Sequence, residues 1–203
     1  VVLVCAVGDT LVDRTPILRI HGATGPLPEA PLRAAVKLGF DRTFEQDPKY
    51  ALRLLVDIAI KALSPAINDP TTAVQALDQI EDLLRRMARY HINDGRIHDT
   101  DGRLRLVMPM PSWEDYLSLA LDEIRVFGIT SVQVVRRMRW CLRALAAALG
   151  DDPRAAAVAR YLSHLDRAIV RSPLDEDDQD AAAAEDAQGL GLSRSQRSRD
   201  GAD

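Results

Sequence analysis

Two segments with helical spacing of apolar residues are joined by the stretch Ser64-Pro65-Ala66-Ile67-Asn68-Asp69-Pro70-Thr71-Thr72-Ala73. Pro65 ends the first segment, because proline lacks an N–H and its ring clashes with the preceding turn of a helix. Asp69 followed by Pro70 favours a new helix, since the carboxylate accepts an early N–H and proline needs no partner in the first turn. The stretch therefore predicts a tight connection between two helices.

The Asp-Pro signal recurs at two other places, Asp47-Pro48 and Asp152-Pro153, and predicts helix starts there as well. Two further helical patterns follow Ser112 and Ser131, which are residues that cap helices. Gly128 and Gly150 follow these patterns and are typical helix stops. Short connections between such helices favour an antiparallel bundle. We expect a mainly α fold, a bundle of about five amphipathic helices.

Short β segments precede and interrupt the predicted helices. Residues 1–20 contain brief apolar runs separated by turn signals, and residues 21–31 are rich in glycine and proline. Residues 96–98 and 103–107 flank Asp101-Gly102, which predicts a small β-hairpin. Because the chain starts with Val1 inside an apolar run, we expect an N-terminal portion to precede it.

Charge and composition divide the chain further. The 203 residues carry a net charge of −4, yet residues 172–203 hold nine acids and three arginines, which leaves the rest slightly basic. This acidic end has no apolar period, so we expect it to be disordered. The predicted organisation is a β module and linker over residues 1–30, a helical domain over 31–171 and a disordered tail over 172–203. Aromatic residues make up only 4% of the chain, so its core must be aliphatic.

Several classes of protein are disfavoured by the same composition. Two distant cysteines, Cys5 and Cys141, do not form a disulfide scaffold, and the four histidines lack the spacing of metal ligands. No glycine-rich phosphate loop or nucleophile elbow occurs, so we expect no metal and no cofactor, and catalysis is disfavoured. The sequence contains no run of about 18 apolar residues, which is the length that a helix needs to span a bilayer.

Several motifs resemble one bacterial family of membrane proteins, the domain of unknown function 2254. They are Arg42, Gln46-Asp47, Leu54–Ala59, Ala62–Pro65, Ile67–Ala73, Asp122–Arg125 and Phe127-Gly128. Members of that family carry transmembrane helices before this region, and they have no activity that transfers to this chain. The resemblance implies a soluble domain beside a membrane, which we expect to face the cytoplasm.

The candidate ligand-binding residues are polar side chains in or near these motifs: Arg42, Asp57, Asn68, Asp69, Thr71 and Arg125. One interpretation is architectural, because turns and helix caps alone explain Asn68, Asp69 and Thr71. The alternative is a polar pocket that binds an anion or a cation. Asp57 either forms surface pairs with Arg53 and Lys61 or is a partly buried acid that faces Arg42 or Arg125.

Three functions stay open at this point. The first is a domain for assembly, sensing or gating in a membrane protein, the second is a small-molecule or ion-binding domain, and the third is a hydrolase using Asp122 or Glu123. Two arginine clusters, residues 85–89 and 136–143, are typical of solvated helix faces, and beside a bilayer they would attract anionic lipid. The expected partners are the transmembrane region, anionic lipid and a second copy of the chain. Nucleic acid is disfavoured, because base-stacking aromatics are scarce.

Overall fold

The structure is a computed structural model that describes residues 1–43 and 47–191. It divides into two compact units. The first contains residues 1–50 and 93–112, and the second contains residues 51–92 and 113–203. The first unit is therefore discontinuous in sequence. The hairpin segment, which the sequence analysis assigned to the helical domain, belongs with the N-terminal strands.

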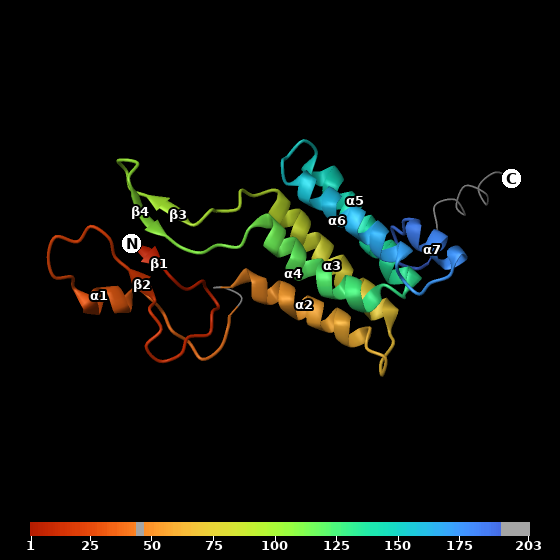
Figure 1. Cartoon of the computed structure of the whole chain (residues 1–203), viewed down its shortest axis with the longest axis horizontal. Helices are drawn as coiled ribbons and strands as arrows, with labels where there is room; N and C mark the ends of the chain where they lie inside the picture. The colour runs from red at the N-terminus through yellow and green to blue at the C-terminus, as the bar shows by residue number, and fades with distance from the viewer. Residues whose placement is uncertain (44–46, 192–203) are drawn as a thin grey trace. The chain divides into compact units, whose positions relative to one another are not determined.

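The first unit is built on a four-stranded sheet with the order β2-β1-β4-β3 (Figure 1). Its strands are β1 (Val2–Leu3), β2 (Leu18–Arg19), β3 (Arg96–His98) and β4 (Leu104–Val107). The pair β3–β4 is antiparallel and confirms the predicted hairpin. The pair β1–β4 is parallel, with Val2 opposite Val107. A short helix, α1 (Glu29–Ala34), lies where the sequence predicted the end of a linker.

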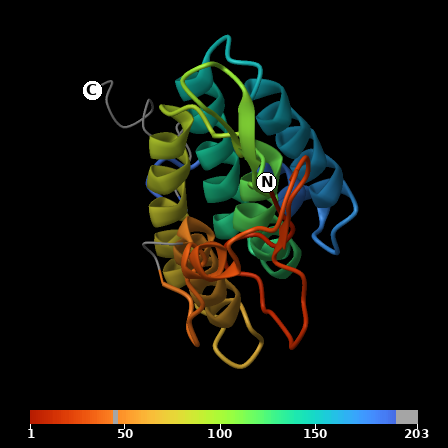
Figure 2. The same ribbon diagram turned by 90° about the vertical axis from the view of Figure 1, so that its left-hand side faces the viewer.

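The predicted helices are confirmed as five long helices. They are α2 (Pro48–Ala62), α3 (Pro70–Ala88), α4 (Trp113–Gly128), α5 (Val132–Leu149) and α6 (Ala155–Val170). Figure 2 shows α3, α5 and α6 side by side, and α5 packs against both of its neighbours. The N-termini of two helices, α5 and α6, differ in detail from the prediction. Ser131 stands at the N-cap of α5 without a side-chain capping bond, and α6 begins after a turn in which Asp152 accepts the N–H of Arg154.

The core of the second unit is aliphatic, as the composition predicts. Its fully buried side chains include Val56, Leu77, Ile80, Leu117, Ile124, Val134, Met138, Leu142, Val158 and Leu165. Trp113 and Tyr116 are the aromatic side chains of this buried set among the described residues. Burial of so many branched side chains supplies most of the free energy that holds the helices together.

The connection between α2 and α3 is architectural. The N–H groups of Ile67 and Asn68 both donate to the carbonyl of Ser64, and Asn68 has a positive φ of 48°, which asparagine tolerates better than most residues. Asp69 caps α3 by accepting the Thr72 N–H at 3.0 Å and the Thr72 hydroxyl at 2.5 Å. The predicted cap is therefore confirmed, and the Asp69 and Thr72 side chains are used within this connection.

The substitution Asp69→Ala is expected to lower the denaturant midpoint, because the Thr72 N–H would lose its acceptor. The hydrogen bonds from Thr72 lower the pKa of the Asp69 carboxyl. Its contribution is therefore present above the unfolded pKa of about 4 and is lost as pH falls through the lower folded value. Urea unfolding between pH 7 and pH 2 measures both effects. The conservative variant Asp69→Asn should retain most of the stability at pH 7, and an unchanged midpoint in Asp69→Ala would contradict the capping role.

The predicted disordered tail is wrong over residues 172–191. This segment contains α7 (Glu176–Ala183), which packs against α5 and α6. Asp175 caps α7 by accepting the N–H of Asp178, and Ala182 is completely buried. A short alanine-rich helix needs no long apolar period, because it buries only one small face. The remainder of the predicted tail, residues 192–203, lies outside the described residues.

Candidate functional site

The sequence-predicted site residues occupy different parts of the fold. Arg42 is exposed and belongs to the first unit, whereas the other five belong to the second unit. Asn68 and Thr71 are exposed in the turn before α3 and in its first helical turn. Asp69 is engaged with Thr72, so its carboxylate already has its partners.

Asp57 pairs with Arg53 across one turn of α2, and Arg53 also binds Glu123 on α4. This arrangement agrees with the predicted Arg53–Asp57 pair on the surface, since the Asp57 side chain is 47% exposed. The hydrogen bond from Arg53 lowers the pKa of Glu123, so this carboxylate stays ionised and is a poor general acid. The second hydrolase candidate, Asp122, accepts a hydrogen bond from Ser118 at 2.6 Å.

Arg125 lies half-buried on α4. Its Nε atom is buried and has no hydrogen-bond partner among the described residues. This isolated donor does not by itself form a site, because the neighbouring acid Glu123 is paired with Arg53.

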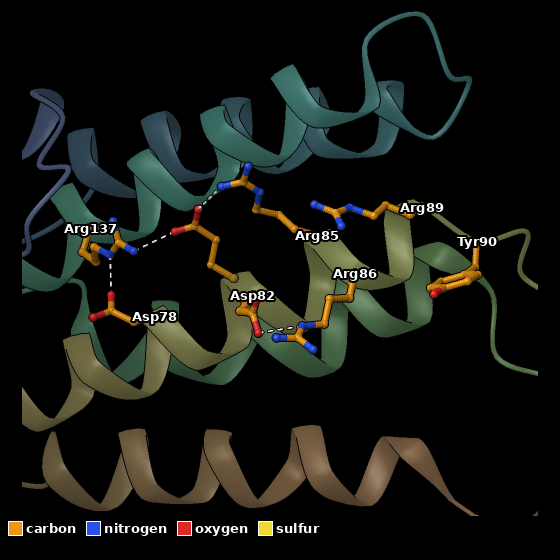
Figure 3. A pocket seen from close by; sticks show the side chains of 8 residues that line it. Asp78, Asp82, Arg85, Arg86, Arg89, Tyr90 and Arg137 are labelled. Atoms are coloured by element: carbon orange, nitrogen blue, oxygen red, sulfur yellow. Dashed lines mark hydrogen bonds and ion pairs between the residues drawn. The ribbon is translucent and has the colours of Figure 1, made fainter.

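A polar groove with a volume of about 740 Å³ lies along α3 and α5 (Figure 3). Its lining residues are Asp78, Glu81, Asp82, Arg85, Arg86, Arg89, Tyr90 and Arg137. All but Arg137 come from α3 or the two residues after it, where spacings of three and four place side chains on one helix face. The lining holds four arginines and three carboxylates, so the groove has an excess of one positive charge.

An ion-pair chain forms the inner wall of this groove. Arg137 binds Asp78 through Nε and Glu81 through Nη2, each at 2.7 Å. The other carboxylate oxygen of Glu81 accepts from Arg85 at 3.3 Å. The side chains of Arg137 and Glu81 are each only 8% exposed, so this pair is desolvated. This part of the groove is rigid, because separating the partners would leave uncompensated charges in a desolvated environment.

The outer part of the groove offers cationic groups that are less engaged. Arg86 is paired with Asp82 at 2.8 Å, but the arginine side chain is 69% exposed. Among the described residues, Arg85 has one ion-pair contact and Arg89 has none. Figure 3 shows these arginines along α3 with Tyr90 at the end of the row. Arg85 and Arg89 therefore present guanidinium groups to solvent, one helical turn apart.

Cys141 lies beneath the inner wall and is not a nucleophile. Its Sγ atom is 3.9 Å from the carbonyl of Leu77, and its thiol is buried. Burial raises the pKa of Cys141 well above its ordinary value, which disfavours the thiolate needed for attack.

Three arginines of α5 are buried, which contradicts the prediction of a solvated helix face. Arg136, Arg137 and Arg139 are between 6% and 7% exposed. Their partners come from α3, α6 and the segment after α7, and only the fold brings these together. The acids Asp78 and Glu81 were missed by the sequence analysis; the spacing of Glu81 and Arg85 by one turn was their one available signal.

No metal centre is evident in the part of the chain that the structure describes. Within residues 1–43 and 47–191, no three His, Cys, Asp or Glu side chains gather in a way that could hold a metal ion. The same residues contain no helix with both the length and the apolar character needed to cross a bilayer.

Comparisons with known proteins agree with the resemblance seen in the motifs. The sequence profile described as "Predicted membrane protein (DUF2254)" matches residues 1–144. Uncharacterized proteins of Mycobacterium bovis (Mb1321c) and Mycobacterium tuberculosis (Rv1290c) are each 36% identical over 143 residues, which cover 70% of this chain and 27% of the relative. The chain thus spans about a quarter of the length of these relatives. No solved structure matches it. The chain belongs to the DUF2254 family of predicted membrane proteins.

Proposed function

We propose that this chain is a sensing domain of a membrane protein and that the α3–α5 groove binds an anionic phosphoryl group. The observation that carries the proposal is the presence of Arg85 and Arg89, one turn apart and weakly engaged, in a groove with excess positive charge. Arginine suits this task because its planar guanidinium donates two parallel hydrogen bonds to phosphate oxygens. Binding would order the outer arginines against the rigid inner wall.

The pair between Glu81 and Arg85 supports an exchangeable site. Its N–O distance is 3.3 Å, and the Arg85 side chain is 47% exposed. Such a pair contributes only about 0–1 kcal/mol, because solvent screens it. An incoming phosphoryl group can therefore recruit Arg85, while Arg137 continues to neutralise Glu81.

The phosphoryl group has two possible sources. One is the headgroup of an anionic lipid, which fits membership of a membrane-protein family and the attraction of about 1 kcal/mol per basic residue near such a surface. The other is a soluble phosphate compound. Our proposal includes a location on the cytoplasmic side, which the two free thiols Cys5 and Cys141 support, since thiols persist in reducing compartments.

The double variant Arg85→Ala/Arg89→Ala tests the groove. Calorimetric titration with pyrophosphate should show affinity reduced by about tenfold or more, because hydrogen bonds to charged groups contribute about 1.5–3 kcal/mol each. The matched control is Arg167→Ala/Arg171→Ala, which removes the same charge from exposed positions on and just after α6. An equal loss in the control would show that only net charge matters, and it would refute the groove.

Binding to lipid vesicles distinguishes the two possible sources of the phosphoryl group. If the ligand is lipid, the unmodified chain should bind vesicles of phosphatidylglycerol and phosphatidylcholine more tightly than vesicles of phosphatidylcholine alone, and the groove variant should lose this difference. If the ligand is soluble, pyrophosphate binds and the anionic lipid adds nothing. Absence of binding in both experiments would overturn the proposed function.

A further inference from the structure

The loop after α7, residues 186–191, is seated on α5 by side chains that donate to its main-chain carbonyls. Gln133 Nε2 donates to Gly189 O at 2.5 Å, and Arg136 Nη1 donates to Gly191 O at 2.7 Å. Arg137 Nη1 donates to Ala187 O at 3.2 Å. The loop therefore turns a row of carbonyl oxygens toward two buried guanidinium groups.

Asp186 organises the loop from within. Its side chain is 1% exposed, and its carboxylate accepts the N–H groups of Gln188, Gly189 and Gly191 at 3.0, 2.9 and 2.6 Å. The negative charge of Asp186 is thus used inside the loop, on main-chain donors. As a result, residues 186–191 offer Arg136 and Arg137 neutral carbonyl oxygens, while Arg143 pairs with Glu185 just before the loop.

Neutral carbonyls are an incomplete match for this arginine surface. Arg136 is 6% exposed, yet its Nε and Nη2 atoms are buried and have no hydrogen-bond partner among the described residues. A buried guanidinium is best satisfied by a carboxylate or phosphate, which accepts two parallel bonds and neutralises the charge. Arg136 therefore keeps two donors for which the loop provides no acceptor.

We infer that residues 186–191 form a displaceable cover over a second anion-binding surface, made by Arg136 and Arg137. The loop carbonyls hold Nη1 of each arginine, so an anion that binds Arg136 through Nη1 and the unpartnered Nη2 competes with the cover. Arg137 also lines the groove, where it holds Asp78 and Glu81. The cover is therefore adjacent to the groove and regulates access to its inner arginine. This inference rests on the proposed function only for the class of ligand.

Gly189 provides a way to unseat the cover. Its φ is +69°, and a Cβ atom there would lie 2.3 Å from Val74 Cγ1 on α3. No side chain fits at this position while the loop is seated. Gly189→Val should therefore displace the loop without removing any of the arginines. Gln188→Val is the matched control, because Gln188 is the exposed neighbour and receives the same side chain.

Two measurements on the full chain test the inference. Hydrogen exchange at the N–H groups of residues 188 and 191 reports whether the loop keeps its seated conformation, because both donate to Asp186, which is buried only in that conformation. Calorimetric titration with pyrophosphate reports anion binding. In Gly189→Val, exchange should quicken and affinity should rise several-fold, because the ligand no longer competes with the cover. Gln188→Val should behave like the unmodified chain.

Further variants separate this inference from the groove. Adding Arg136→Ala to Gly189→Val should abolish the gained affinity, whereas adding Arg85→Ala/Arg89→Ala should leave that gain in place. If exchange quickens without a gain in affinity, the cover hides no anion site and the inference is wrong, whatever the groove binds. If exchange stays slow in Gly189→Val, the loop does not leave α5 even with a side chain at position 189, and the inference fails on that ground. Circular dichroism confirms that the helices persist in each variant.

Discussion

Arg137→Ala is expected to destabilise the protein by about 3–5 kcal/mol, because it removes one partner from a buried ion pair. Glu81 is 8% exposed and receives its shortest hydrogen bond from Arg137, at 2.7 Å. Without Arg137, the buried Glu81 charge would keep the 3.3 Å contact with Arg85 as its remaining ion pair among the described residues. Asp78 and the carbonyl of Ala187 would lose a donor as well.

Arg85→Ala is the control for this prediction, because it removes the other partner of Glu81. The Arg85 side chain is 47% exposed and Arg137 still neutralises Glu81, so the loss of Arg85 should cost no more than about 1 kcal/mol. Guanidinium-induced unfolding of the two variants gives the comparison directly. A double-mutant cycle of Arg137→Ala with Glu81→Ala isolates the energy of the pair itself. Equal costs for the two arginine variants would contradict the assignment of Arg137 as the buried partner.

Ile80→Ala is expected to cost about 2–5 kcal/mol, because it leaves a cavity in the aliphatic core. Ile80 lies on α3 and is 1% exposed, in the cluster where α3 packs against α5. Ile58→Ala is the matched control, since Ile58 is the same residue type on a helix but is 49% exposed. Its cost should stay within about 0.5 kcal/mol. Thermal unfolding of both variants decides whether α3 is central to the second unit.

The long helices could be predicted from sequence because their start signals are local. Asp69 caps α3 through a hydrogen bond to a residue three positions later, and Pro70 fits the first turn on steric grounds alone. The hairpin of β3 and β4 was predicted for the same reason, from the turn residues between its strands. In each case the determining contact lies within a few residues of the signal.

The C-terminal segment could not be predicted because its determinants are distant in sequence. Acidic composition indicates disorder when no partner is known. In the structure, Arg137 donates to Ala187, and Gln133 donates to Gly189, across 50 and 56 residues. These contacts hold α7 and its loop against α5, but no apolar periodicity in the acidic segment predicts them.

The sequence indicated the basic side of the candidate groove but not its acidic side. The basic residues near Arg85 form a recognisable cluster, and lipid attraction was already an interpretation of them. The cluster on α5 looked the same in sequence, yet Arg136 is buried whereas Arg89 is exposed. Burial depends on what packs over a helix face, and for arginine the sequence of that helix does not reveal it. The acidic side of the groove depends on the packing of α3 against α5.

The parallel pair of β1 and β4 has a consequence for how the chain acquires its structure during synthesis. The N–H of Val107 donates to the carbonyl of Val1 at 3.0 Å, and the two residues are far apart in sequence. A ribosome must therefore deliver α2 and α3 before β1 can pair with β4, whereas β2 is available to β1 much earlier. Closing so long a loop is slow, since its entropy is lost before the contacts form. We therefore expect the parallel pair of β1 and β4 to form later than the local pairs β1–β2 and β3–β4.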